Sequence, residues 1–170
     1  PAATAAEIDE IYQLLITLGA TFIERAPDEA SCERIWQLRR EFSYSLRDTG
    51  LTKLNEDIVI PRSKLVDLVN FARHLEKQTG IAIACFGHAG DGNIHTNLMV
   101  RDYDNPTARA HADAALDLLF TWILDQGGAI TGEHGIGLAK KRWIRQALGE
   151  TSFNVHRDIK NVLDPNQIRK

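Results

Sequence analysis

Two glycine-rich stretches carry the residues of this sequence with the clearest chemical potential. The first is GHAGDGNIHTN at positions 87–97, and the second is GAITGEHGIG at positions 128–137. Together they hold three of the six histidines, one glutamate and seven of the twelve glycines. Glycine lets a backbone turn sharply and approach a ligand closely. Imidazole and carboxylate groups on such a frame indicate a metal site or an acid–base site.

The first stretch is typical of a β-hairpin, because Asp91-Gly92 is a favoured two-residue turn between apolar runs. A turn centred there places His88 directly opposite His95 on one face, with Cβ atoms about 5 Å apart. Two imidazoles at that separation can bind one divalent metal. Asn97 falls on the same face as His95 and could reach a ligand beside the metal. The alternative is a hairpin whose histidines only form hydrogen bonds within the sheet.

In the second stretch Glu133 and His134 are adjacent, so in extended backbone their side chains point to opposite sides. This arrangement predicts Glu133 as a third metal ligand and His134 facing a substrate. Two histidines and one glutamate leave an open coordination position, which is typical of catalytic metal sites. The alternative is that Glu133 caps the following helix and His134 is solvated. We interpret the run 140–142, KKR, as a solvated helix face, with a phosphate or a partner domain as the alternative.

Hydrophobic periodicity predicts the elements that must position these stretches. Helices are expected at 5–18, 28–47, 63–80, 106–126, 138–148 and 151–163, and strands at 20–25, 57–60, 81–86, 94–100 and 129–131. Strands separated by helices, with one tight hairpin, predict an α+β fold. We expect a single domain with a largely antiparallel sheet covered by helices and a ferredoxin-like core.

Composition narrows the function classes. The 170 residues carry a net charge of −3 and no basic run longer than three residues, which argues against nucleic-acid binding. The apolar runs are too short to span a membrane, and no secretion signal opens the chain, so we expect a cytoplasmic protein. Cys32 and Cys85 are expected to be reduced structural thiols. Because the chain starts at Pro1 without an initiating Met and stops at Lys170, we expect it to be part of a longer polypeptide.

The two motifs, together with WQLR at 36–39, EDIVIPRS at 56–63 and LDP at 163–165, resemble the C-terminal domain of FAD-linked oxidases. These flavoenzymes of the vanillyl-alcohol-oxidase superfamily include D-lactate dehydrogenases, D-2-hydroxyglutarate dehydrogenases and the glycolate oxidase flavoprotein subunit. The resemblance implies that residues 1–170 are the substrate (cap) domain of a longer flavoprotein. The FAD-binding domain would then lie elsewhere in the parent chain.

The resemblance also implies oxidation of a D-2-hydroxy acid to the 2-oxo acid, with hydride transfer to FAD. By position it implies a divalent metal, zinc, on His88, His95 and Glu133, with His134 as the catalytic base. The implied carboxylate-binding residues are Arg39 and Lys53, and Ser43 and Asn97 are further implied substrate contacts. We expect the chain alone, without its flavin domain, to be inactive.

Two functions of other classes stay open. One is a metal-dependent hydrolase, in which a metal-bound water attacks the substrate. The other is a noncatalytic module that binds a metal or a small acid. The expected partners are a 2-hydroxy acid, the FAD-binding domain, an electron acceptor, the surface of the inner membrane and a second copy of the protein.

Overall fold

The computed structural model describes residues 2–168 and divides into two compact units, one ending at Ser45 and one beginning at Leu46. The helices are α1 (Ala2–Thr17), α2 (Glu29–Arg47), α3 (Leu65–Thr79), α4 (Pro106–Asp125) and α5 (Ile144–Leu163). The strands are β1 (Thr52–Val59), β2 (Ala82–His88) and β3 (Asn93–Val100). Short 3-10 turns at Arg62–Lys64 and Lys141–Trp143 precede α3 and α5.

The first unit consists of α1, most of α2 and the segment that joins them. The strand predicted at 20–25 is wrong, because this segment is irregular and pairs with no other strand. Side chains hold it instead: Arg25 pairs with Asp9 of α1, and Glu24 pairs with Arg34 of α2. The segment is therefore tied to both helices through charged groups at its surface.

The second unit contains one antiparallel sheet in the order β1-β3-β2. The predicted strand 57–60 is longer than expected, since β1 begins at Thr52. The strand predicted at 129–131 is reduced to a single antiparallel bridge between Ala129 and the outer edge of β1 at Val59. The strand order is that of the split βαβ arrangement, with the Ala129 bridge at the edge, followed by β1, β3 and β2. The predicted α+β class and antiparallel sheet are confirmed.

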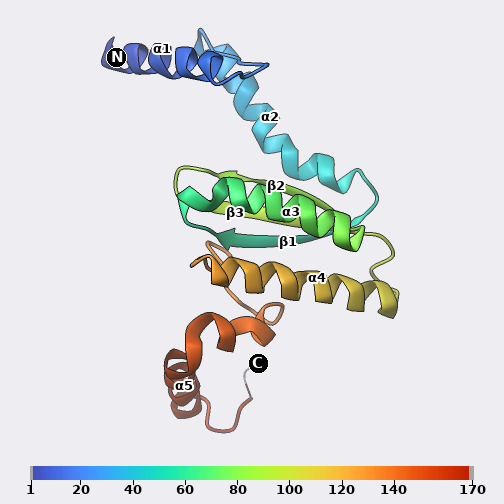
Figure 1. The fold of residues 1–170 in the computed structure, drawn as a ribbon. Helices are drawn as coiled ribbons and strands as arrows, with labels where there is room; N and C mark the ends of the chain where they lie inside the picture. The colour runs from blue at the N-terminus through green and yellow to red at the C-terminus, as the bar shows by residue number, and fades with distance from the viewer. Residues whose placement is uncertain (1, 169–170) are drawn as a thin grey trace. The chain divides into compact units, whose positions relative to one another are not determined.

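The two faces of this sheet differ in character. Helices α3 and α4 run side by side along one face (Figure 1) and close the core against alternate residues of the strands. The fully buried members of this core include Ile58, Leu75, Leu98, Phe120 and Ile123. Residues at the intervening strand positions point to the opposite face, because side chains alternate along a strand. That opposite face carries the polar residues of the predicted site.

The C-terminal helix α5 begins at Ile144, later than the predicted start at 138. The predicted break between 148 and 151 is confirmed, because Gly149 inside α5 has a φ of 70° and a ψ of 168°, which are not helical. None of the helices within residues 2–168 is both long and apolar enough to cross a membrane.

Candidate functional site

The hairpin between β2 and β3 closes through four residues, 89–92, and not through the predicted two-residue turn. The backbone N–H groups of Asp91 and Gly92 both donate to the carbonyl oxygen of His88, at 3.3 and 2.9 Å. The Asp91 side chain accepts from the N–H of Asn93 at 3.0 Å. These bonds end the ladder at His88 and Asn93, which therefore pair with each other.

The longer turn moves the two histidines from opposed to diagonal positions. His95 pairs with Phe86, so the predicted direct pairing with His88 is wrong. The register shift is an even number of residues, which leaves both imidazoles on the same face of the sheet. Their ring centroids lie 6.3 Å apart. The predicted shared face of His88 and His95 is confirmed.

Asp57 of β1 connects this hairpin to the second glycine-rich stretch. Its side chain is fully buried, and its Oδ2 accepts hydrogen bonds from the backbone N–H groups of Gly132, Glu133 and His134 at 2.9, 2.6 and 2.8 Å. Burial raises the pKa of Asp57, but the three hydrogen bonds and the nearby His134 outweigh it and lower this pKa to about 2. The carboxylate is therefore ionised at neutral pH and fixes the loop that carries Glu133 and His134.

His95 lies at the centre of the polar face. It pairs with Asp57 across the sheet, and its Nδ1 is 4.0 Å from Asp57 Oδ1. Its ring stacks on that of His134, with centroids 5.6 Å apart and planes inclined by 25°. Burial lowers the pKa of His95, despite the opposing effect of Asp57. This imidazole is accordingly neutral at physiological pH.

Asn93 positions the Glu133 carboxylate. Its Nδ2 donates to Glu133 Oε1 at 2.7 Å, and its own side chain is buried. Gly132 makes this approach possible, because a Cβ there would lie 2.5 Å from Asn93 Oδ1. The fold thus brings His88, His95 and the Glu133–His134 pair to one region, as the two motifs predicted.

The metal site itself stays a prediction. Within the part of the chain that the structure describes, no three His, Cys, Asp or Glu side chains form a group that could hold a metal ion. Glu133 instead bonds to Asn93, and His88 is exposed at the end of β2.

The predicted substrate contacts fall in both units. Asn97 is fully buried on the polar face, and its Nδ2 donates to the carbonyl oxygens of Ala84 and His95, both at 3.1 Å. Lys53 lies on the same face of β1, and burial, followed by the nearby Arg47, lowers its pKa. Arg39 and Ser43 lie one turn apart on α2, in the first unit. That these residues share one substrate stays a prediction.

Sequence reasoning missed two residues of this region, Asp57 and Lys140. The Lys140 side chain is only 8% exposed, and its Nζ donates to the carbonyl oxygens of Ile130 and Asp57 at 2.7 and 3.2 Å. It also pairs with Glu56 Oε2 at 3.2 Å. The solvated helix face predicted for 140–142 is therefore wrong at Lys140. The signal available was the Glu56-Asp57 pair inside a buried strand, which requires partners for two carboxylates.

Comparison with known proteins agrees with these motifs. A family model described as "FAD linked oxidases, C-terminal domain" matches residues 1–169. A D-lactate dehydrogenase (cytochrome), mitochondrial, of Kluyveromyces lactis is 31% identical over 95% of this chain and 28% of its own length. Glycolate oxidase subunit GlcD of Bacillus subtilis is 29% identical over 95% of this chain and 34% of its length. A probable D-2-hydroxyglutarate dehydrogenase, mitochondrial, of Oryza sativa subsp. japonica is 31% identical over 84% of this chain and 24% of its own length. The chain thus spans about a third or less of these relatives.

Proposed function

Because the chain belongs to the FAD-linked oxidase C-terminal domain family, we propose that it forms the substrate-binding and catalytic half of a 2-hydroxy acid dehydrogenase. The full enzyme oxidises a D-2-hydroxy acid, of the lactate, glycolate or 2-hydroxyglutarate type, to the 2-oxo acid. The names of the relatives support this substrate class. The relatives' greater length supports an FAD-binding domain outside residues 1–170, and FAD bound there supplies the hydride acceptor.

The observation that carries this proposal is the placement of His134. Three consecutive backbone hydrogen bonds to Asp57 fix the loop around it, and its ring stacks on His95 while its side chain stays exposed. An imidazole that is fixed at its backbone and open at its ring can act as a general base. We assign His134 to remove the proton of the substrate α-hydroxyl, while the α-hydrogen leaves as hydride.

The carboxylate of the substrate is assigned to two cations, Arg39 and Lys53, and Ser43 and Asn97 are assigned as further substrate contacts. Arg39 can bind a carboxylate in a bidentate manner, with Ser43 one turn further along α2. Lys53 and Asn97 lie on the polar face of the sheet that also carries His95. A negatively charged substrate is held through its carboxylate in this proposal, which leaves its hydroxyl to face His134.

We assign a divalent metal, zinc, to His88, His95 and Glu133. The donor set fits, since two imidazoles and one carboxylate are the ligands of many catalytic zinc sites with an open position. A bound ion would polarise the α-hydroxyl and lower its pKa. Asn93 orients the Glu133 carboxylate within this set through the 2.7 Å hydrogen bond.

The test is flavin-linked turnover by the flavoprotein that contains this chain, with D-lactate, glycolate and D-2-hydroxyglutarate and a dye as acceptor. We expect His134→Ala to lower kcat by about 10²–10⁴-fold, the usual contribution of a general base. His111→Ala, which changes an exposed histidine of α4, is the matched control and should leave kcat unchanged. Full turnover by His134→Ala would remove His134 from the mechanism. Hydrolysis without flavin would favour the metal-dependent hydrolase.

A further inference from the structure

We propose that Asp57 is the positioning residue that aligns the two glycine-rich stretches, orienting the His95 ring with one carboxylate oxygen and the Glu133–His134 backbone with the other. Its role in catalysis rests on the proposed function, whereas its effect on the His95 ring does not. Asp57 lies in neither stretch, on a different strand from both histidines of the hairpin.

The Oδ2 atom of Asp57 fixes the backbone of Glu133 and His134. Three consecutive N–H groups in a segment without helix or strand converge on this one oxygen, at 2.6–2.9 Å. The loop has no ladder of its own to satisfy these donors, and a buried or half-buried N–H group needs an acceptor. The charged acceptor makes such hydrogen bonds roughly twice as strong as neutral ones. The backbone of the assigned base is thus held by Asp57.

The main chain of the same residue holds the far end of the loop. Lys140 Nζ donates to the Asp57 carbonyl oxygen at 3.2 Å and to the Ile130 carbonyl oxygen at 2.7 Å. The Asp57 side chain lies on the polar face, while Lys140 reaches Glu56 on the helix-covered face. The segment from Ile130 to Lys140 therefore passes around the edge of β1 and is anchored to Asp57 from both faces.

The Oδ1 side of Asp57 acts on His95. Oδ1 and His95 Nδ1 are both buried, both lack a hydrogen-bond partner in the described structure, and lie 4.0 Å from each other. A carboxylate can only accept hydrogen bonds, so its charge favours the tautomer of His95 that carries its proton on Nδ1. That tautomer leaves the lone pair on Nε2, where a ligand can be bound.

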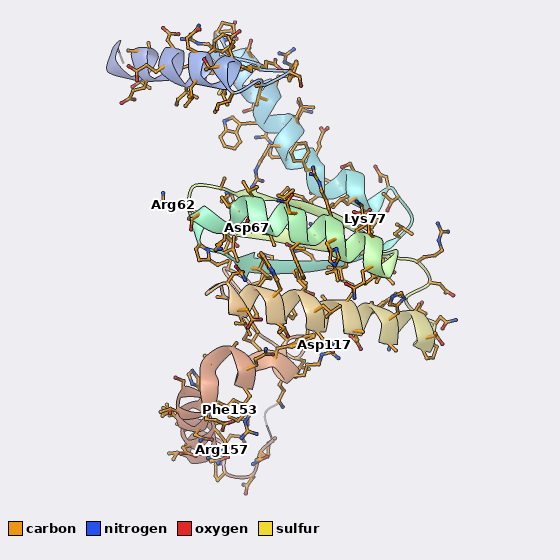
Figure 2. All side chains as sticks on the ribbon, viewed as in Figure 1. Arg62, Asp67, Lys77, Asp117, Phe153 and Arg157 are labelled. Atoms are coloured by element: carbon orange, nitrogen blue, oxygen red, sulfur yellow. The ribbon has the colours of Figure 1, made fainter. Side chains whose placement is uncertain are left out.

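The experiment measures the His95 tautomer by ¹⁵N NMR in the 170-residue chain without metal, at a pH where the ring is neutral. We expect the Nδ1–H tautomer in the wild type. We expect Asp57→Asn to shift it toward Nε2–H, because the amide can present an N–H to Nδ1. Asp67→Asn is the matched control and should change nothing, because Asp67 lies on α3 (Figure 2) and pairs with Lys64. An Nε2–H tautomer in the wild type would overturn the proposal without any variant.

Two further measurements separate positioning from a merely structural role. Asp57→Asn should weaken Zn²⁺ binding to the chain by about 10- to 100-fold, as expected for a residue that orients a metal ligand. In the flavoprotein it should lower kcat by a similar factor and leave KM nearly unchanged, because Arg39 and Lys53 still bind the carboxylate. Unchanged Zn²⁺ affinity together with an unchanged tautomer would refute the role of Asp57. Absence of dehydrogenase activity in the wild type would refute the proposed function and leave the tautomer result standing.

Discussion

Replacing Lys140 with methionine is expected to destabilise the second unit severely, although the side chain keeps its apolar stem. The Lys140 side chain is 8% exposed, and its ammonium group has three oxygen partners, two carbonyl groups and Glu56. Its removal leaves the Glu56 carboxylate, which is itself 12% exposed, without a counter-charge. Breaking a buried ion pair from one side costs about 3–5 kcal/mol. We expect a loss of that size in the free energy of unfolding.

Urea unfolding of the 170-residue chain, followed by circular dichroism, measures this loss. Lys141→Met is the matched control, because Lys141 is the exposed neighbour in the same sequence run, and it should change the free energy by no more than about 0.5 kcal/mol. The double variant Lys140→Met/Glu56→Gln should be more stable than Lys140→Met alone, since no unpaired charge remains.

Equal unfolding midpoints for Lys140→Met and Lys141→Met would refute the reasoning. A double variant that is no more stable than Lys140→Met would show that the Glu56 charge is not what makes the substitution costly. In that case the two carbonyl hydrogen bonds alone would account for the loss.

Three further predictions concern other parts of the second unit. The pKa of Asp57 is about 2 in the folded chain against its ordinary value of 3.8, so its contribution to stability is complete above about pH 5 and is lost as the pH falls toward 2. Urea titrations should therefore show that the free energy of unfolding falls by about 2 kcal/mol more in the wild type than in Asp57→Asn between pH 5 and pH 2. An equal dependence on pH in the two proteins would contradict this. Gly92→Ala should cost about 2–4 kcal/mol, because Gly92 has φ of 82° and a Cβ there would overlap the Ile60 carbonyl oxygen. Thermal melts measure this loss, and Gly90→Ala, where a Cβ meets nothing within 4 Å, should melt like the wild type. Burial raises the pKa of the Cys85 thiol, so a thiol reagent at pH 8 should label exposed Cys32 quickly and Cys85 only slowly; equal rates would count against the packing of Cys85.

Much of the candidate site followed from local rules. Side chains alternate strictly along a strand, so the positions of His95 and Asn97 on one face depended only on the existence of the strand. His88 lies on that face although the predicted turn length was wrong, because an even shift in register preserves the face. The glycines predicted that other groups approach the backbone closely, and the Asn93 side chain does lie against Gly132.

Local rules did not predict the length of the hairpin turn or the limits of the strands. The Asp91 side chain accepts from the Asn93 N–H and closes a four-residue loop, although Asp91-Gly92 is also a good two-residue turn. The segment 20–25 has a plausible strand composition, but a strand needs a neighbour and this one has none. Local preference alone does not choose between these outcomes.

The sequence by itself therefore determined the α+β class and the shared face of the hairpin histidines, and it supplied the candidate side chains of the site. Only the tertiary structure decided how the two glycine-rich stretches are joined. Asp57 and Lys140 do this through contacts between residues 75 to 83 positions apart in the chain. Long-range pairing of a buried charge depends on which elements pack together, and no local pattern around either residue records its partner. The same lysine is a solvated side chain or the anchor of the site according to that packing.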